Sequence, residues 1–242
     1  MRKLCYALLS FLILVSCSTQ YYVEGKSTVQ SMDGKKLYLK VYADGDLKDI
    51  DSCEVIHGMF QFTGQLDSAV MVNLFMDDEG LMPLVLEENE IQVHIDKAQQ
   101  YVTGSPLNDT LYNFIREKSR LDNLMAELPH KESRMIMDGV SEDVIMLRLN
   151  DEAQRLAAEQ DRLITRFITS NFDNVLGSGV FMILTSGYPY PILTPQIEEI
   201  ISKATPYFKN NAYVQRYMQA AHENMQQMGF GTDSLQADSV LK

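Results

Sequence analysis

Positively charged residues are in the minority in this sequence. It contains 21 Lys and Arg residues and 33 Asp and Glu residues, which gives a formal net charge of −12 at pH 7. Nucleic-acid binding needs a basic footprint, so the charge balance argues against a nucleic-acid partner. The same balance disfavours electrostatic adhesion to anionic lipid headgroups. Because the acids are spread along the chain, we interpret them as a source of solubility.

Recognisable catalytic and metal-binding motifs are also missing. The four histidines are His57, His94, His130 and His222. None is paired with a second histidine at helical spacing or with a cysteine, so the sequence predicts no metal site. The acidic clusters 77–79 and 87–88 are interpreted as solvated turn tips, since catalytic carboxylates must face each other across a cleft. We predict no catalytic residue and no cofactor, while a hydrolase built from dispersed residues stays open.

The N-terminus has the layout of an export signal. Arg2 and Lys3 are followed by an apolar run of 12 residues, Leu4 to Val15. As a helix this run would span roughly 18 Å, which is too short for a hydrocarbon core of about 30 Å. Residues 1–16 are therefore predicted to be a signal peptide rather than a membrane span.

The end of this segment resembles the lipobox of bacterial lipoproteins. Leu14-Val15-Ser16-Cys17 supplies an aliphatic residue, a tolerated residue, a small residue and a cysteine. The small residue lets a peptidase approach the bond, and the thiol can form a thioether to diacylglycerol. The resemblance implies cleavage between Ser16 and Cys17 and a lipidated N-terminus at residues 17–19, with two or three acyl chains giving stable anchoring. The alternative is a secreted protein whose cysteine lies there by accident.

Cysteine is scarce, and this limits the chemistry further. Cys5 would leave with the signal peptide and Cys17 would carry lipid, so Cys53 would be the one remaining thiol. The mature chain then has no intramolecular disulfide and no C-x-x-C pair. We expect Cys53 to be an inert small hydrophobic residue.

Residues 20–104 have the pattern of an antiparallel β-sandwich-like domain. Ile91, Val93 and Ile95 alternate with polar residues and share one face of a strand. A tight turn is expected at His57-Gly58, where glycine can adopt positive φ. Short apolar runs separated by such turns are typical of sandwiches or partly open barrels. The predicted strands are 21–29, 37–42, 55–56, 59–62, 69–75, 84–86, 91–95 and 101–102.

After Gly104 the hydrophobic period changes to that of helices. Ser105 is expected to cap the first helix, and Pro129 to end it. Further helices are predicted from Ser141 to Ser170, from Val175 to Ser186, from Thr194-Pro195 onward, and over 212–228. The fold class is therefore α+β, with a helical domain at 105–228 and a polar tail at 229–242.

Several segments of the β-rich half resemble the domain of unknown function 4369. Tyr22-Val23-Glu24-Gly25 opens the first strand, and Asp51-Ser52 precedes a strand, a glycine and Phe60-x-Phe62-x-Gly64. A later hairpin of that domain resembles Leu84-Val85-Leu86-Glu87 and Ile91-Gln92-Val93. The segment Val102 to Asn108 resembles the exit into helices.

The resemblance implies a lipoprotein of the Gram-negative cell envelope. Members of this family commonly carry a helical connector and then a thioredoxin-like domain with a C-x-x-C pair. Residues 108–228 are similar to that connector, but the chain ends near the position where the redox domain would begin. The resemblance therefore does not imply a thiol–disulfide oxidoreductase.

These observations leave two functional hypotheses. The first is a membrane-anchored lipoprotein that binds an envelope protein or a small ligand, with Tyr188, Tyr190 and His94 as its possible binding surface. The second is an accessory to periplasmic thiol–disulfide handling beside a separate thioredoxin-like protein. Residues 18–20, which follow Cys17, contain neither an inner-membrane Asp nor an acidic surface-export run. By analogy, we expect the outer membrane, with the protein facing the periplasm.

Overall fold

The protein has an α+β fold in which β-strands precede helices along the chain. A computed structural model describes residues 19–43 and 45–228. The chain divides after Asp109 into two compact units, called here the β unit and the helical unit. The predicted signal peptide, Ser16, Cys17 and the tail 229–242 lie outside the described residues.

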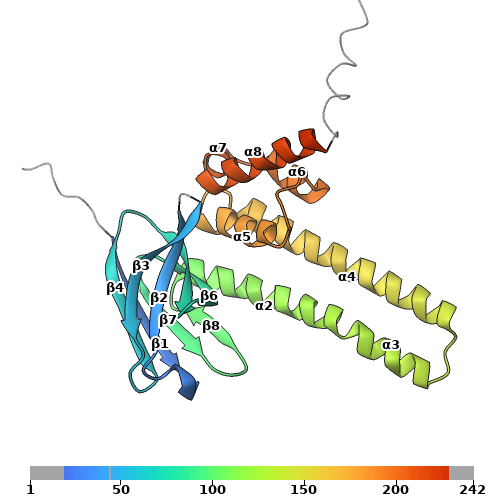
Figure 1. The fold of residues 1–242 in the computed structure, drawn as a ribbon, viewed down its shortest axis with the longest axis horizontal. Coiled ribbons are helices and arrows are strands. Elements are labelled where there is room, and N and C mark those ends of the chain that lie inside the picture. Colours follow the sequence, from blue (N-terminus) through green and yellow to red (C-terminus); the bar gives the residue numbers. More distant parts are fainter. Residues whose placement is uncertain (1–18, 44, 229–242) are drawn as a thin grey trace, which may run out of the picture. The chain divides into compact units, whose positions relative to one another are not determined.

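The β unit contains two four-stranded sheets, which Figure 1 shows facing each other. One sheet has the order β4-β1-β7-β8 and the other β3-β2-β5-β6. The strands are β1 (Thr19–Ser27), β2 (Lys36–Ala43), β3 (Asp46–Glu54), β4 (Met59–Leu66), β5 (Val70–Met76), β6 (Glu79–Leu86), β7 (Glu90–Ile95) and β8 (Gln100–Thr103). The predicted sandwich-like fold is therefore confirmed.

Alternating side chains of the strands form the core of the β unit. On β1, Tyr21 and Val23 are buried, whereas Glu24 and Lys26 are exposed. This alternation places one face of each sheet in the interior and leaves the other to solvent. Buried side chains of the two sheets include Phe60, Phe62, Ile91, Val93, Ile95, Leu37, Leu39, Val72, Leu74, Met82, Leu84 and Leu86.

Two features of the sheets differ from the sequence prediction. β1 pairs with β7 in parallel register, although the other strand pairs are antiparallel. Residues 46–54 form a strand that the pattern did not reveal, because they are mostly polar and exposed. β3 lies at a sheet edge and pairs with β2 alone in its sheet, so it does not need the apolar alternation of an inner strand.

The turn at His57-Gly58 is confirmed. Both residues have positive φ, 53° and 73°. Ile56 and Met59 exchange two backbone hydrogen bonds across the turn, with N···O distances of 2.9 and 3.0 Å. The expected strand at 55–56 is wrong, since Ile56 forms only an isolated bridge with Met59.

The helical unit contains the part of α2 that follows Asp109. Among the described residues it also contains six further helices. Figure 1 shows α2 and α3 running beside the long helix α4. Leu156 of α4 packs with Leu121 and Leu128, and Leu149 and Leu163 pack against this cluster. The helices are α2 (Pro106–Ala126), α3 (Leu128–Met137), α4 (Glu142–Ser170), α5 (Val175–Ser186), α6 (Pro195–Lys203), α7 (Pro206–Lys209) and α8 (Ala212–Gln227).

Short polar side chains determine where several of these helices begin. The side chain of Asn174 accepts a hydrogen bond from the backbone of Leu176, and Thr194 accepts one from Ile197. The predicted stop at Pro129 is wrong in one respect. α2 ends before it, but Pro129 then lies in the first turn of α3, where a missing N–H is tolerated.

Within residues 19–43 and 45–228, no helix is long and apolar enough to cross a membrane.

Candidate functional site

The glycines and aromatic residues of the first strand pair pack as complementary partners. Gly25 lies opposite Phe60, and Gly64 lies opposite Tyr21. A Cβ atom on Gly25 would lie 2.0 Å from the Phe60 ring, and one on Gly64 would lie 2.5 Å from the Tyr21 hydroxyl. The Phe60-x-Phe62-x-Gly64 pattern therefore specifies core packing between β1 and β4, rather than a catalytic group.

A Gly25→Ala variant should lose stability because its methyl group overlaps Phe60. Overpacking of this kind costs about 1–3 kcal/mol of unfolding free energy, measurable by urea denaturation. Gly80→Ala is the matched control, since that glycine also lies opposite an aromatic residue, but its Cβ would be 3.5 Å from Phe75. Equal stability changes in the two variants would contradict the packing explanation.

Asp51 of the same pattern links the two sheets. The Tyr21 hydroxyl, on β1, donates a hydrogen bond of 2.9 Å to Asp51 Oδ2, on β3. Burial raises the pKa of Tyr21 well above its usual value, and the neighbouring Asp51 carboxylate raises it further. Tyr21 therefore remains a neutral donor, and the pair has a structural role.

The exit from the sheets into α2 depends on a buried asparagine. Asn108 is fully buried, and its amide bonds both the N–H and the C=O of Val85 on the edge strand β6, at 2.9 and 2.7 Å. Its Nδ2 also donates to Ser105 Oγ at 2.8 Å. Asn108 thus supplies the hydrogen bonds that a neighbouring strand would otherwise give to β6 at Val85. These bonds explain why the first turn of α2 belongs to the β unit.

Glu87, in the loop between β6 and β7, caps the N-terminus of α2, and this corrects two sequence predictions. Its carboxylate accepts hydrogen bonds from the backbone N–H groups of Leu107, at 2.9 Å, and Asn108, at 3.4 Å. The cap of this helix is therefore Glu87 rather than the Ser105 side chain. Glu87 is also half-buried and is not part of a solvated tip. A carboxylate here complements the positive end of the helix dipole.

Cys53 is half-buried on β3, and its thiol is poorly suited to nucleophilic chemistry. Burial raises the pKa of Cys53 to about 11, partly offset by a hydrogen bond with the Gln61 backbone and increased further by Asp51. Since the thiolate is the reactive form, little of it is present near neutral pH.

The three predicted binding-surface residues lie in different units. His94 is on β7, where its ring stacks on Tyr101 with a centroid distance of 4.6 Å. Tyr188 and Tyr190 lie together in the loop between α5 and α6. The sequence did not indicate the stacking of His94, because the pairing of β7 with β8 is a tertiary feature.

The α5–α6 loop is fixed by two residues of α8. Tyr217 Oη accepts a hydrogen bond from the N–H of Ile192 at 3.1 Å and donates one to its carbonyl at 2.9 Å. Asn224 donates to the carbonyl of Pro191 at 2.9 Å. Tyr190 remains 46% exposed on this fixed loop. A rigid, exposed tyrosine presents a large amphipathic surface at little entropic cost, as is typical of recognition sites.

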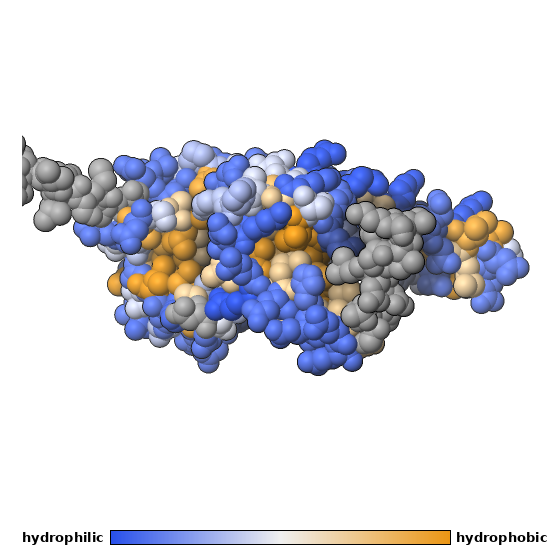
Figure 2. Space-filling view, turned by 90° about the horizontal axis from the view of Figure 1, so that it is seen from above, coloured by the Kyte–Doolittle hydropathy of each residue, from blue (hydrophilic) through white to orange (hydrophobic). Residues whose placement is uncertain are grey.

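Apolar side chains are exposed where α3 turns into α4. Ile136, Met137, Met146 and Leu147 are 61%, 78%, 56% and 73% exposed. Figure 2 shows hydrophobic residues gathered at this end of the helical hairpin. Grouped apolar exposure of this kind is typical of contact surfaces.

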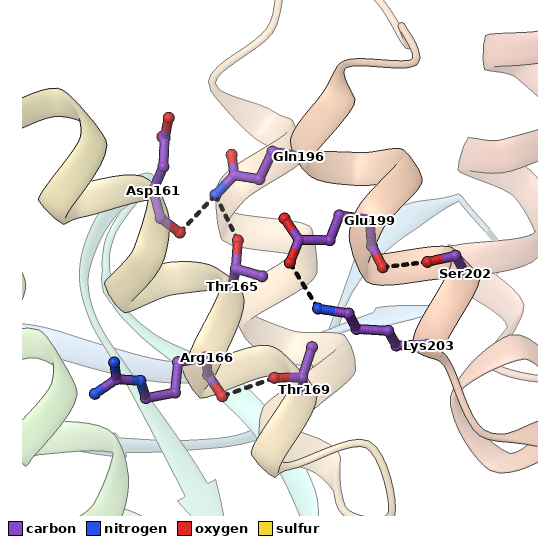
Figure 3. Close-up of polar contacts among 8 residues, drawn as sticks. All are labelled: Asp161, Thr165, Arg166, Thr169, Gln196, Glu199, Ser202 and Lys203. Carbon is purple, nitrogen blue, oxygen red and sulfur yellow. Dashed lines mark hydrogen bonds and ion pairs between the residues drawn. The ribbon is translucent and has the colours of Figure 1, made fainter. Parts of the chain in front are cut away.

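A groove between α4 and α6 is lined mainly by polar residues, and several of them bind one another. Figure 3 shows Gln196 donating to the carbonyl of Asp161 and to Thr165 Oγ1, at 3.1 and 3.2 Å. Lys203 donates to Glu199 at 2.7 Å. The Gln196 contacts join the two helices, whereas the Lys203 contact lies within α6. The guanidinium groups of Arg162 and Arg166, which also line the groove, have no partner among the described residues.

Metal binding finds no support in the described part of the chain, where no three His, Cys, Asp or Glu side chains lie close enough to share an ion.

Comparison with known proteins identifies the β unit alone. No curated protein and no solved structure matches the chain. Residues 21–111 match the family model described as Domain of unknown function (DUF4369), and no thioredoxin-like domain is detected. This range covers most of β1, the seven other strands and the buried Asn108. Residues 21–111 are therefore similar to the DUF4369 domain.

Proposed function

We propose that the protein is a lipoprotein of the outer membrane, facing the periplasm, that binds a partner protein or a small ligand without catalysing a reaction. The anchor is proposed from the Leu14-Val15-Ser16-Cys17 pattern. Its support is that β1 begins at Thr19, only two residues after Cys17. The described strands and helices therefore begin after the predicted cleavage site.

The binding role rests mainly on the α5–α6 loop. Tyr190 is exposed, and the Tyr217 and Asn224 side chains hydrogen-bond the loop backbone at Ile192 and Pro191, directly after Tyr190. A surface that is already ordered loses less conformational entropy when a partner binds. The exposed apolar end of the α3–α4 hairpin adds a second contact surface within the same unit.

A role in thiol–disulfide handling is the second candidate, and Cys53 gives it little support. Burial raises the pKa of this thiol to about 11, and a single cysteine cannot cycle as a dithiol. Any such role would depend on a separate redox protein and not on this side chain.

The binding proposal can be tested by photo-crosslinking in cells. A photoreactive amino acid in place of Tyr190 is expected to give a discrete adduct, detected as a band of higher mass and identified by mass spectrometry. The Tyr217→Phe substitution removes both hydrogen bonds to Ile192 and should reduce this adduct several-fold, since the loop is no longer fixed.

The control is the same photoreactive amino acid in place of Tyr207, which is 54% exposed on α7 and lies outside the loop. Equal adducts at both positions, or none at position 190, would contradict a recognition role for this loop.

A further inference from the structure

Four arginines form a row along the exposed side of α4. Arg148, Arg155, Arg162 and Arg166 are spaced by seven, seven and four residues, and all are exposed. At 100° per residue they lie within an arc of about 40°, and at 1.5 Å per residue they extend over about 27 Å. We call this row the arginine stripe.

The arginine stripe lacks the ion pairs that other cations of these helices have. Within residues 19–43 and 45–228, no guanidinium of the stripe forms an ion pair or hydrogen bond with another residue. By contrast, carboxylates pair with Lys118, Arg120, Lys131, Arg134 and Lys203. A row of four positive charges is therefore left open in a protein whose net charge is −12.

The stripe overlaps the α4–α6 groove at one end, where Arg162 and Arg166 line it. Figure 3 shows the guanidinium of Arg166 directed away from Lys203 and Gln196. Gln196 and Lys203 of the groove have partners there, whereas the stripe offers guanidinium donors that are unused within the described residues. Guanidinium groups pair bidentately with carboxylates, so the stripe complements a row of carboxylates.

We propose that the arginine stripe binds an elongated acidic segment of a partner protein. This inference rests on the proposed binding role and specifies the chemistry of the partner. Arg148, Arg155 and Arg162 recur about every 10.5 Å, the spacing of acidic residues seven apart on a partner helix. An anionic membrane is the alternative that the test separates, since exposed Asp151, about 60° around α4 from Arg148, would lie near either partner.

The test measures binding of the full mature protein to poly-L-glutamate at low ionic strength, followed by fluorescence anisotropy. Replacing all four stripe arginines by glutamine is expected to weaken binding about tenfold, since four exposed ion pairs of modest strength would be lost together. The control replaces Lys118, Lys131, Arg134 and Lys203 by glutamine, which removes the same charge from ion-paired positions. Its affinity is expected to change less than twofold.

Equal weakening in both variants would overturn the proposal, because binding would then follow net charge alone. Tighter, stripe-dependent binding to phosphatidylglycerol vesicles would overturn it in favour of a membrane surface. The assay requires neither the lipid anchor nor the Tyr190 loop, so its failure is distinguishable from failure of the proposed function.

Discussion

A Cys17→Ala variant is expected to incorporate no palmitate and to lose its lipid-dependent membrane association. The thioether to diacylglycerol can form only on a thiol, and alanine has none. Two or three acyl chains bind a bilayer stably because each buried methylene contributes about 0.8 kcal/mol. The measurement is metabolic labelling with palmitate, with the mass of the N-terminal peptide as a second readout.

The other two cysteines supply matched controls. Cys5→Ala changes the predicted signal peptide, and Cys53→Ala changes the half-buried thiol of β3. Both variants should keep the label. Label that persists in Cys17→Ala, or a wild-type chain that begins with an unmodified Cys17, would refute the proposed anchor.

Asn108→Ala is expected to destabilise the protein by about 2–5 kcal/mol. The substitution leaves the N–H and C=O of Val85 without their partner, and each unsatisfied buried group costs about 1–3 kcal/mol. Val85 is fully buried, so we expect little compensation by water. The measurement is the unfolding free energy in urea. Asn108→Asp should also destabilise, because a carboxylate cannot donate to the carbonyl of Val85.

Asn113→Ala is the control for this prediction. Asn113 lies on the same helix but is exposed, and it accepts a hydrogen bond only from Arg116 among the described residues. A change within about 0.5 kcal/mol is expected for such a surface substitution. If Asn108→Ala were as mild as Asn113→Ala, the buried amide would not join α2 to the sheet.

Local patterns predicted most elements of this fold correctly. The alternation of Ile91, Val93 and Ile95 indicated β7, whose apolar residues are buried. Thr194 followed by Pro195 indicated the start of α6, where the Thr194 side chain does cap the helix. These features depend on residues within a few positions of one another, so periodicity and capping chemistry suffice to predict them.

The candidate binding surface was predicted only in part. Tyr188 and Tyr190 were predicted as part of a possible binding surface, and Tyr190 is exposed in the α5–α6 loop. The hydrogen bonds that Tyr217 of α8 makes to the loop join it to Ile192, 25 residues earlier in the chain, and they depend on how α8 packs. His94 was grouped with these tyrosines, whereas in the β unit it stacks on Tyr101.

The sequence by itself determined the order of strands and helices, the negative charge and the Leu14-to-Cys17 pattern, since each is a property of neighbouring residues or of composition. Only the tertiary structure decided that β3 is an edge strand, that β1 and β7 are parallel, and that Asn108 pairs with Val85. It also decided that Lys131 has a carboxylate partner whereas Arg155 has none among the described residues. Pairing between distant segments depends on which surfaces are buried together when the chain folds, and no local period encodes it.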